Sequence, residues 1–332
     1  MLGHHLHDHL EERIYKNTKM TPDDLVQIAS MRADLIDEKK IIEPFYGSYF
    51  MTKCMTEQMI EEEYAHLPLA ILRPTLITAS ARYPSPGFVD NTMLYTGTIV
   101  LTAQGLLRGL HFAKKANLEM LPVDLATNAT IVAAWHTATE SGHNKEIKVY
   151  NLFNPNRINF DQFGKGLDQC IANFPLKSML WKPSKYFSKF KLSDYFYQKM
   201  APIIGSFGDY LSGTNKLSKV LKVATADAKA YEIGRYRNIS GDTKNVESLR
   251  DRLFNTDQES IEKFDFDRTT MVWDKYAEDY YHGIRQYVLK EQSSDLPAAR
   301  KKLKKMQVIH YGAQISLLVL FLTLIAKKYL LN

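Results

Sequence analysis

The stretch from Phe45 to Arg73 constrains the fold most, because it holds one complete helix–loop–strand unit. Its hydrophobic pattern predicts an amphipathic helix from Tyr49 to about Tyr64. The following run, Leu69–Leu72, is short and continuously apolar, as expected of a strand buried on both faces. Such a unit indicates an α/β chain with a doubly wound parallel sheet, whose ligands bind beyond the carboxyl ends of the strands. The helix should bury Met51, Cys54, Met55, Met59 and Ile60, with Glu57, Glu61, Glu62 and Glu63 off that side.

Tyr49 and Lys53 form a candidate proton-transfer pair at the start of this helix. Four residues apart, their side chains lie on the same side, one turn from each other. A free phenol has a pKa of about 10 and needs a nearby cation to act as an acid or base at neutral pH. The pairs Tyr15–Lys19 and Tyr195–Lys199 share the spacing, so the surrounding elements, not the spacing, favour Tyr49.

Composition and charge narrow the class of protein. The 332 residues, 45% of them hydrophobic, allow one large or two ordinary domains with sizeable cores. The net charge of +6 is concentrated beside a hydrophobic tail, which indicates a membrane surface and not nucleic acid. Two cysteines fit a reducing compartment. The basic residues are Arg300, Lys301, Lys302, Lys304 and Lys305.

The first residues contain neither a secretory signal nor a phosphate-binding glycine turn. Met1–Leu10 is polar and histidine-rich, and no GxGxxG pattern precedes Tyr49. The histidines could bind a metal or form an exposed leader, and the absence of companion cysteines or paired acids leads us to expect no metal site. They are His4, His5, His7 and His9.

Further elements are predicted along the first half of the chain. Thr21 should cap a helix reaching about Lys40, and Asp124 should cap the next predicted helix. The helix that Asp124 caps should bury Leu125, Ala129, Val132, Ala133 and Trp135. A strand should follow over Ile147–Phe153, and Asn159 or Asp161 should cap a further helix that ends near Ala172. The Pro- and Gly-rich segment Tyr83–Asn91 either lines a pocket or is a surface connection. Further along the chain, the cations Arg108, Lys114 and Lys115 either meet an anionic substrate or face water.

The second half predicts helices. Residues 181–230 read as amphipathic helices that either pack in a core or meet a membrane interface. A helix should run from Trp273 to Lys290, with Gly283 marking a close approach of another segment. Val308–Ala326 is near the minimum length to cross a bilayer, so it is either a membrane anchor or a buried terminal helix.

Taken together and in order, several motifs closely resemble the fatty acyl-CoA reductases, particularly the insect type. The resemblance covers nearly the whole chain. Its motifs are Tyr49–Lys53, Leu67–Pro74, Pro86–Asn91, Leu121–Asp124, Phe264–Asp267, Trp273–Tyr276 and Gly283–Arg285.

The resemblance implies an extended short-chain dehydrogenase: a Rossmann-like domain using NADPH, a helical C-terminal domain and attachment to an intracellular membrane, the endoplasmic reticulum or the peroxisome. The implied reaction reduces a long-chain acyl-CoA to a fatty alcohol and releases CoA. Tyr49 would donate the proton, while Lys53 would lower its pKa and bind the nicotinamide ribose. Pro74, Thr75 and Ile77 would approach the nicotinamide.

The chain departs from the family pattern upstream of Tyr49. It has no counterpart of the family's glycine-rich turn or catalytic Ser/Thr. We therefore expect a partial Rossmann-like domain that lacks its N-terminal strands, binds NADPH weakly or not at all, and belongs to a truncated, inactive form of the reductase. The alternative is a catalytically dead, membrane-attached protein that binds acyl-CoA or acts as a scaffold. We expect a reductase domain over 1–174, a helical domain over 175–295 and a basic linker with an anchor helix over 296–332; the sequence carries no expectation about oligomeric state.

Overall fold

The computed structural model describes most of the chain and divides it into two compact units. The described residues are 9–17, 19–31, 45, 47–107, 110–111, 117–140, 146–184, 187–188 and 239–330, with isolated residues between 199 and 222. Unit 1 comprises Met1–Tyr83, Asn117–Ile158 and Arg237–Met271, and unit 2 comprises Pro84–Ala116, Asn159–Tyr236 and Val272–Asn332. Each unit is built from three separate segments of the chain, so the units do not correspond to the domains expected over 1–174, 175–295 and 296–332. Those domain boundaries stay a prediction.

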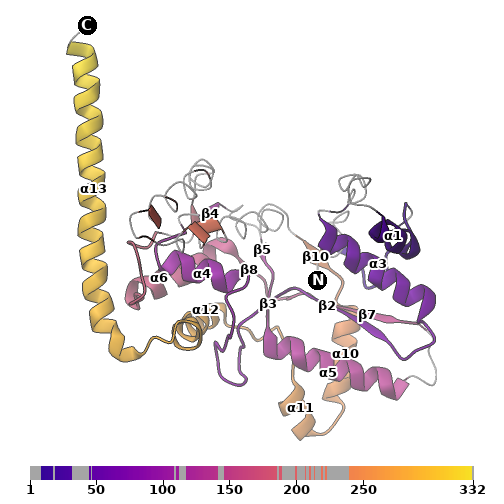
Figure 1. Cartoon of the computed structure of the whole chain (residues 1–332). Helices are drawn as coiled ribbons and strands as arrows, with labels where there is room; N and C mark the ends of the chain where they lie inside the picture. The colour runs from indigo at the N-terminus through magenta and orange to yellow at the C-terminus, as the bar shows by residue number, and fades with distance from the viewer. Residues whose placement is uncertain are drawn as a thin grey trace. The chain divides into compact units, whose positions relative to one another are not determined.

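Parallel strand pairs form the centre of unit 1 (Figure 1). Strand β2 (Ala70–Pro74) pairs with β7 (Lys148–Leu152), which confirms both predicted strands. Directly after Thr75, β3 (Leu76–Thr78) pairs with β6 (Met120–Pro122). Strand β6 was not predicted, because a strand of three residues carries too little pattern. The α/β class with short parallel strands is therefore confirmed. The other short strands that begin in this unit are β1 (His9–Leu10), β5 (Asn117–Leu118), β8 (Ile158–Asn159) and β10 (Ser240–Gly241).

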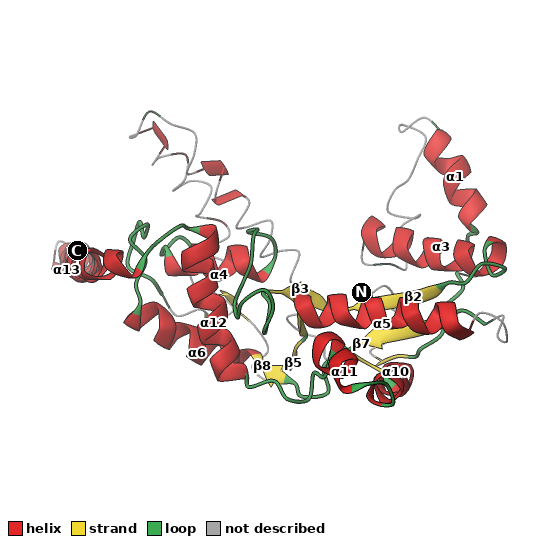
Figure 2. Ribbon diagram, turned by 90° about the horizontal axis from the view of Figure 1, so that it is seen from below, coloured by secondary structure: helices red, strands yellow, loops and turns green. Residues whose placement is uncertain are grey.

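Helices cover two sides of the β2–β7 pair. In Figures 1 and 2, α1 (Pro22–Ser30) and α3 (Ser48–Glu63) lie on one side, and α5 (Val123–Glu140), α10 (Lys244–Phe254) and α11 (Gln258–Phe264) on the other. The core between β7, α5 and α10 buries aliphatic and aromatic side chains from all three elements. A second cluster, around Met51 and Met55, joins α3 to α1.

The predicted helix ends hold at some positions and fail at others. Thr21 caps α1 through a reciprocal capping box with Asp24, as predicted, although the stretch towards Lys40 lies outside the described residues. In α5, the prediction is confirmed for Leu125, Ala129, Val132 and Ala133, which are buried, and wrong for Trp135, which is 43% exposed; His136 is buried in its place. Asn159, not Asp161, caps α6.

Unit 2 is built mainly from helices. Its elements are α4 (Tyr95–Ala103), α6 (Phe160–Asn173), α12 (Trp273–Gly283), the π-helix η2 (Ile284–Val288), the 3-10 helix η3 (Ser293–Asp295) and the strands β4 (Leu110–His111) and β9 (Phe187–Ser188). The Thr96 and Tyr280 hydroxyls, 2.7 Å apart, join α4 to α12. The predicted helix over Trp273–Lys290 is confirmed as α12, which continues directly into the π-helix η2 and ends at Val288.

Gly283 marks a close approach, as the sequence predicted. A Cβ at Gly283 would lie 1.7 Å from the carbonyl oxygen of Gly87, and Gly87 itself has a φ of +77°. The loop over Tyr83–Asn91 therefore has a structural role here, because its Gly87 backbone packs directly on α12.

The chain ends in one long helix, α13 (Leu296–Leu330), drawn in yellow in Figure 1. It contains the whole predicted anchor segment. Its length and composition suffice to cross a membrane, and the apolar stretch is not buried against the rest of the protein.

Candidate active site

A buried ion pair fixes the middle of α3 against β2. Arg73, 2% exposed, donates from Nε to Glu57 Oε1 at 3.0 Å and from Nη2 to Glu57 Oε2 at 2.5 Å. The same guanidinium donates to the carbonyl oxygens of Glu11 and Arg13 and to the Asn151 side chain. Sequence analysis placed Glu57 on the open side of the helix and missed this pair. A charged residue inside a buried strand was the available signal, since a buried charge needs a partner.

The ion pair sets which residues of α3 lie beside the end of β2. The loop between α3 and β2 is six residues long, so helix and strand run antiparallel. From the level of Glu57 and Arg73, four helical residues back and two strand residues forward each cover roughly 6 Å. Ideal geometry then predicts Lys53 near the level of Thr75, just beyond the carboxyl end of β2, and Tyr49 near the level of Ile77 in β3.

Tyr49 and Lys53 meet on the first turn of α3, where the phenol is partly open. Tyr49 is 48% exposed, and the Lys53 ammonium lies 5.9 Å from the centre of its ring. Partial burial raises the pKa of the Tyr49 phenol above its ordinary value. A role in proton transfer at neutral pH would need the opposite shift, which a cation closer to the phenol oxygen would produce.

The residues expected to approach a nicotinamide include one unsatisfied polar group. The Thr75 hydroxyl is buried and has no hydrogen-bond partner in the structure. Ile77 is 45% exposed, whereas Pro74 pairs within the β2–β7 ladder. A carboxamide offers both donors and acceptors, and an apolar side chain can cover a ring face. Thr75 and Ile77 therefore fit a nicotinamide, with Lys53 level with them.

Of the other two Tyr–Lys pairs, Tyr15–Lys19 lies in the described part of the chain, and its setting differs from that of Tyr49–Lys53. Tyr15 is buried, its hydroxyl accepts a hydrogen bond from the Glu11 backbone, and it lies outside any helix, while Lys19 is exposed. Tyr195 falls outside the described residues. The choice of Tyr49–Lys53 over the other two pairs stays a prediction.

Asp124 organises the loop after β3 and does not cap a helix, which corrects its predicted role. Helix α5 already starts at Val123, and the Asp124 carboxylate accepts backbone N–H groups of Ala81, Arg82 and Tyr83 at 2.8, 2.8 and 3.1 Å. Three such bonds hold the loop that follows β3 against the start of α5.

Glu119, which precedes β6, is a second buried carboxyl that sequence analysis missed. It is 7% exposed, and burial raises its pKa to about 7, although Arg157 Nε at 3.3 Å and the nearby Arg268 act in the opposite direction. This carboxyl is therefore neutral over a wide acidic range.

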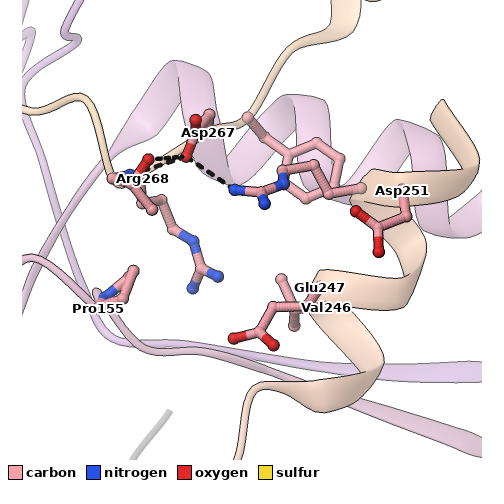
Figure 3. A pocket seen from close by; sticks show the side chains of 9 residues that line it. Pro155, Val246, Glu247, Asp251, Asp267 and Arg268 are labelled. Atoms are coloured by element: carbon pink, nitrogen blue, oxygen red, sulfur yellow. Dashed lines mark hydrogen bonds and ion pairs between the residues drawn. The ribbon is translucent and has the colours of Figure 1, made fainter. Parts of the chain in front are cut away.

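One pocket of about 190 Å³ opens in unit 1 between α10 and the 266–269 segment (Figure 3). Arg268 points into it, and burial lowers the pKa of this guanidinium to about 10. Arg250 binds Asp267 at 3.1 Å, and Glu247 and Asp251 add two further carboxylates. The pocket offers the phosphates of a nucleotide no net positive charge, so it is a poorer cofactor site than the carboxyl end of β2.

The histidine-rich start gives no metal site in the described part of the chain. His4, His5 and His7 lie outside the described residues, and His9 binds the Ser240 hydroxyl and the Asp242 carboxylate. No group of three or more potential ligands gathers among the residues that the structure describes. Arg108, Lys114 and Lys115 also lie outside them.

Comparison with known proteins gives two family matches and a set of relatives. An NAD-binding family model described as male sterility protein matches residues 2–130, and a second, described by the same words, matches residues 189–291. The chain is 28% identical to fatty acyl-CoA reductase 2 of Mus musculus, over 96% of this chain and 63% of that protein. It is equally 28% identical to fatty acyl-CoA reductase 1 of Gallus gallus and of Homo sapiens, over 94% of this chain and 61% of each. The chain thus spans less than two thirds of the length of these relatives.

The α/β fold and the NAD-binding match indicate the nicotinamide-dependent oxidoreductase class. Within that class, the two family matches and the relatives support the fatty acyl-CoA reductase family for this chain.

Proposed function

We propose that this protein is an alcohol-forming fatty acyl-CoA reductase that uses NADPH, with Tyr49 and Lys53 as its proton-transfer pair. The proposal is supported by the Arg73–Glu57 contact, from which we infer that Lys53 lies near the level of the unsatisfied Thr75 hydroxyl, and by the Lys53 ammonium 5.9 Å from the centre of the Tyr49 ring. The names of the relatives support the substrate class, a long-chain acyl-CoA.

The proposed reaction needs two reductions at one carbonyl carbon. When bound, a nicotinamide cofactor would supply one hydride to each reduction, two in all. In the first reduction the carbon–sulfur bond breaks and CoA leaves as a thiolate, which takes a proton from water. In the second, Tyr49 gives its phenolic proton to the carbonyl oxygen of the aldehyde as negative charge develops there. Lys53 stabilises the resulting phenolate until it is protonated again from solvent, and the Thr75 hydroxyl would hold the carboxamide of the cofactor by a hydrogen bond.

The membrane part of the proposal rests on α13. We propose that this helix attaches the protein to an intracellular membrane, the endoplasmic reticulum or the peroxisome, so that acyl-CoA enters and alcohol leaves near lipid. Both the substrate and the product carry long hydrocarbon chains, which partition into the apolar part of a membrane.

The competing function is a membrane-attached acyl-CoA-binding or scaffolding protein without turnover. The raised pKa of the Tyr49 phenol and its exposure favour this reading, because such a phenol is a weak proton donor to a neutral carbonyl at pH 7.

One experiment separates the two functions. The full chain in detergent is titrated with NADPH and with NADH by nicotinamide fluorescence, then incubated with a long-chain acyl-CoA and NADPH while fatty alcohol is measured by mass spectrometry. The reductase proposal predicts preferential NADPH binding and alcohol as product. If no alcohol forms, a separate titration with acyl-CoA is made by isothermal calorimetry, and acyl-CoA binding without any alcohol would establish the competing function.

A matched pair of variants assigns the role of Lys53. Lys53→Met should weaken NADPH binding about tenfold or more, because it removes the proposed contact to the ribose. Lys19→Met, at an exposed position on the same unit, should leave binding unchanged. Equal binding by both variants would remove Lys53 from the cofactor site.

A further inference from the structure

The first four turns of α13 have two opposite faces. One face packs on the rest of unit 2, to which α13 itself belongs: Ala299 is fully buried, and Leu303, Met306 and His310 are half-buried. Their three- and four-residue spacing keeps them on one side of the helix. The indole Nε1 of Trp181 donates to Nδ1 of His310 at 3.1 Å, which ties this face to the loop after α6.

The opposite face carries a lysine cluster that points away from the protein. Lys301, Lys304 and Lys305 are all exposed. At about 100° per residue they lie roughly opposite the packed face. Val308, 74% exposed, continues the same face one turn further along. This lysine cluster is available to a partner outside the chain.

Aromatic and polar side chains gather one turn beyond the lysine cluster. Trp181 meets His310, and the Lys182 ammonium lies 5.1 Å from the ring of Tyr311. Tryptophan and tyrosine beside basic groups are typical of the boundary between lipid headgroups and hydrocarbon. This belt marks where α13 changes character.

Beyond the belt, α13 exposes apolar side chains on every side. A helix that is apolar all round and not packed in protein is stable in a bilayer and not in water. The side chains, each 54–62% exposed, are Ile315, Leu318, Val319, Leu320, Leu322 and Leu324. The bilayer is therefore the occupant that this segment requires.

The lysine cluster then lies at the height of the lipid headgroups. Lys305 precedes Tyr311 by six residues, or about 9 Å of helix, and a lysine stem spans several ångströms more. Between Leu296 and Asn332 the chain has no Asp or Glu, so nothing on α13 neutralises the cluster.

We propose that Lys301, Lys304 and Lys305 form a binding surface for anionic lipid headgroups, which selects the membrane that α13 enters and fixes how deep it sits. The proposal rests on the membrane attachment proposed above and adds a lipid class to it. Lysines near an anionic membrane surface add to one another, so the three together should raise membrane binding about tenfold to a hundredfold. Added salt screens the charges and weakens this contribution.

Vesicle flotation tests the proposal. The full chain, diluted out of detergent, is mixed with phosphatidylcholine vesicles or with vesicles that also contain phosphatidylserine, and the bound fraction is measured at low and high salt. Wild type should bind the anionic vesicles about tenfold or more tightly at low salt, with a smaller difference at high salt. The triple variant Lys301→Gln, Lys304→Gln, Lys305→Gln should lose this preference and keep its binding to neutral vesicles.

The control removes the same charge elsewhere. Lys19→Gln, Lys244→Gln, Lys263→Gln changes three exposed lysines outside α13 and should keep the preference for anionic vesicles. Binding to both vesicle types with no preference, or an equal loss in both triple variants, would overturn the lipid surface while membrane attachment stands. Absence of binding to any vesicle would overturn both.

Discussion

The middle and the first turn of α3 differ in almost every physical respect, although they lie only two turns apart. In the middle, Glu57 and the buried Arg73 share two hydrogen bonds, and backbone carbonyls take further donors of the guanidinium. Near the start of the helix, Tyr49 is half exposed and the Lys53 ammonium lies 5.9 Å from the centre of its ring. A buried, multiply bonded contact thus fixes the middle of the helix, whereas the Tyr49–Lys53 pair lies where solvent and ligands can reach it.

Breaking the rigid contact should have the largest effect on stability. Glu57→Ala leaves the Arg73 guanidinium buried without its carboxylate, and we expect the free energy of unfolding to fall by about 3–5 kcal/mol. Denaturant unfolding measures this. Glu63→Ala, at an exposed position of the same helix, should change stability by less than about 0.5 kcal/mol. Similar losses in both variants would mean that Arg73 does not depend on Glu57.

The buried carboxyl of Glu119 should make stability depend on pH in an unusual direction. The folded protein holds this proton up to pH about 7, whereas the unfolded chain releases it near 4.5. The unfolded state therefore binds fewer protons over this window, and stability falls by about 3 kcal/mol as the pH rises through it.

Glu119→Gln removes this titration and tests the sign. Relative to wild type, the variant should gain stability as the pH rises from about 4.5 to 7, as measured by denaturant unfolding across that range. Glu63→Gln should follow wild type at every pH. A variant that loses stability at the upper end would show that Glu119 is charged in the folded protein.

The Asp124 contacts should have a smaller, local effect. Asp124→Ala removes the acceptor of three backbone N–H groups, and we expect a loss of about 2 kcal/mol. Hydrogen exchange should show faster exchange at Ala81, Arg82 and Tyr83, while the exposed control Asp251→Ala changes neither quantity. Unchanged exchange at these three amides would contradict the contact.

The sequence predicted those parts of unit 1 that are set by local patterns. An apolar run between a helix and Arg73-Pro74 is enough to locate β2, and Thr21-Pro-Asp-Asp24 is enough to start α1. The strand β6 was missed because three residues carry too little pattern, and Asp124 was misread because its acceptor role depends on a loop more than forty positions away.

The candidate site was predictable in part for the same reason. Tyr49 and Lys53 share a helix, so their proximity follows from spacing alone. The partner of Arg73 and the unsatisfied Thr75 hydroxyl are properties of tertiary packing, which no pattern within α3 or β2 reports. The raised pKa of Glu119 likewise comes from burial among residues distant in the sequence.

The most direct test of the contrast within α3 is Tyr49→Phe, compared with Tyr64→Phe at the other end of the helix. The account predicts that Tyr49→Phe lowers fatty alcohol formation from acyl-CoA and NADPH by about 10²–10⁴-fold, the usual contribution of a general acid. Its free energy of unfolding should stay within about 0.5 kcal/mol of wild type, and Tyr64→Phe should change neither quantity. Full turnover in Tyr49→Phe would contradict the assignment of the first turn of α3 as the proton-transfer site.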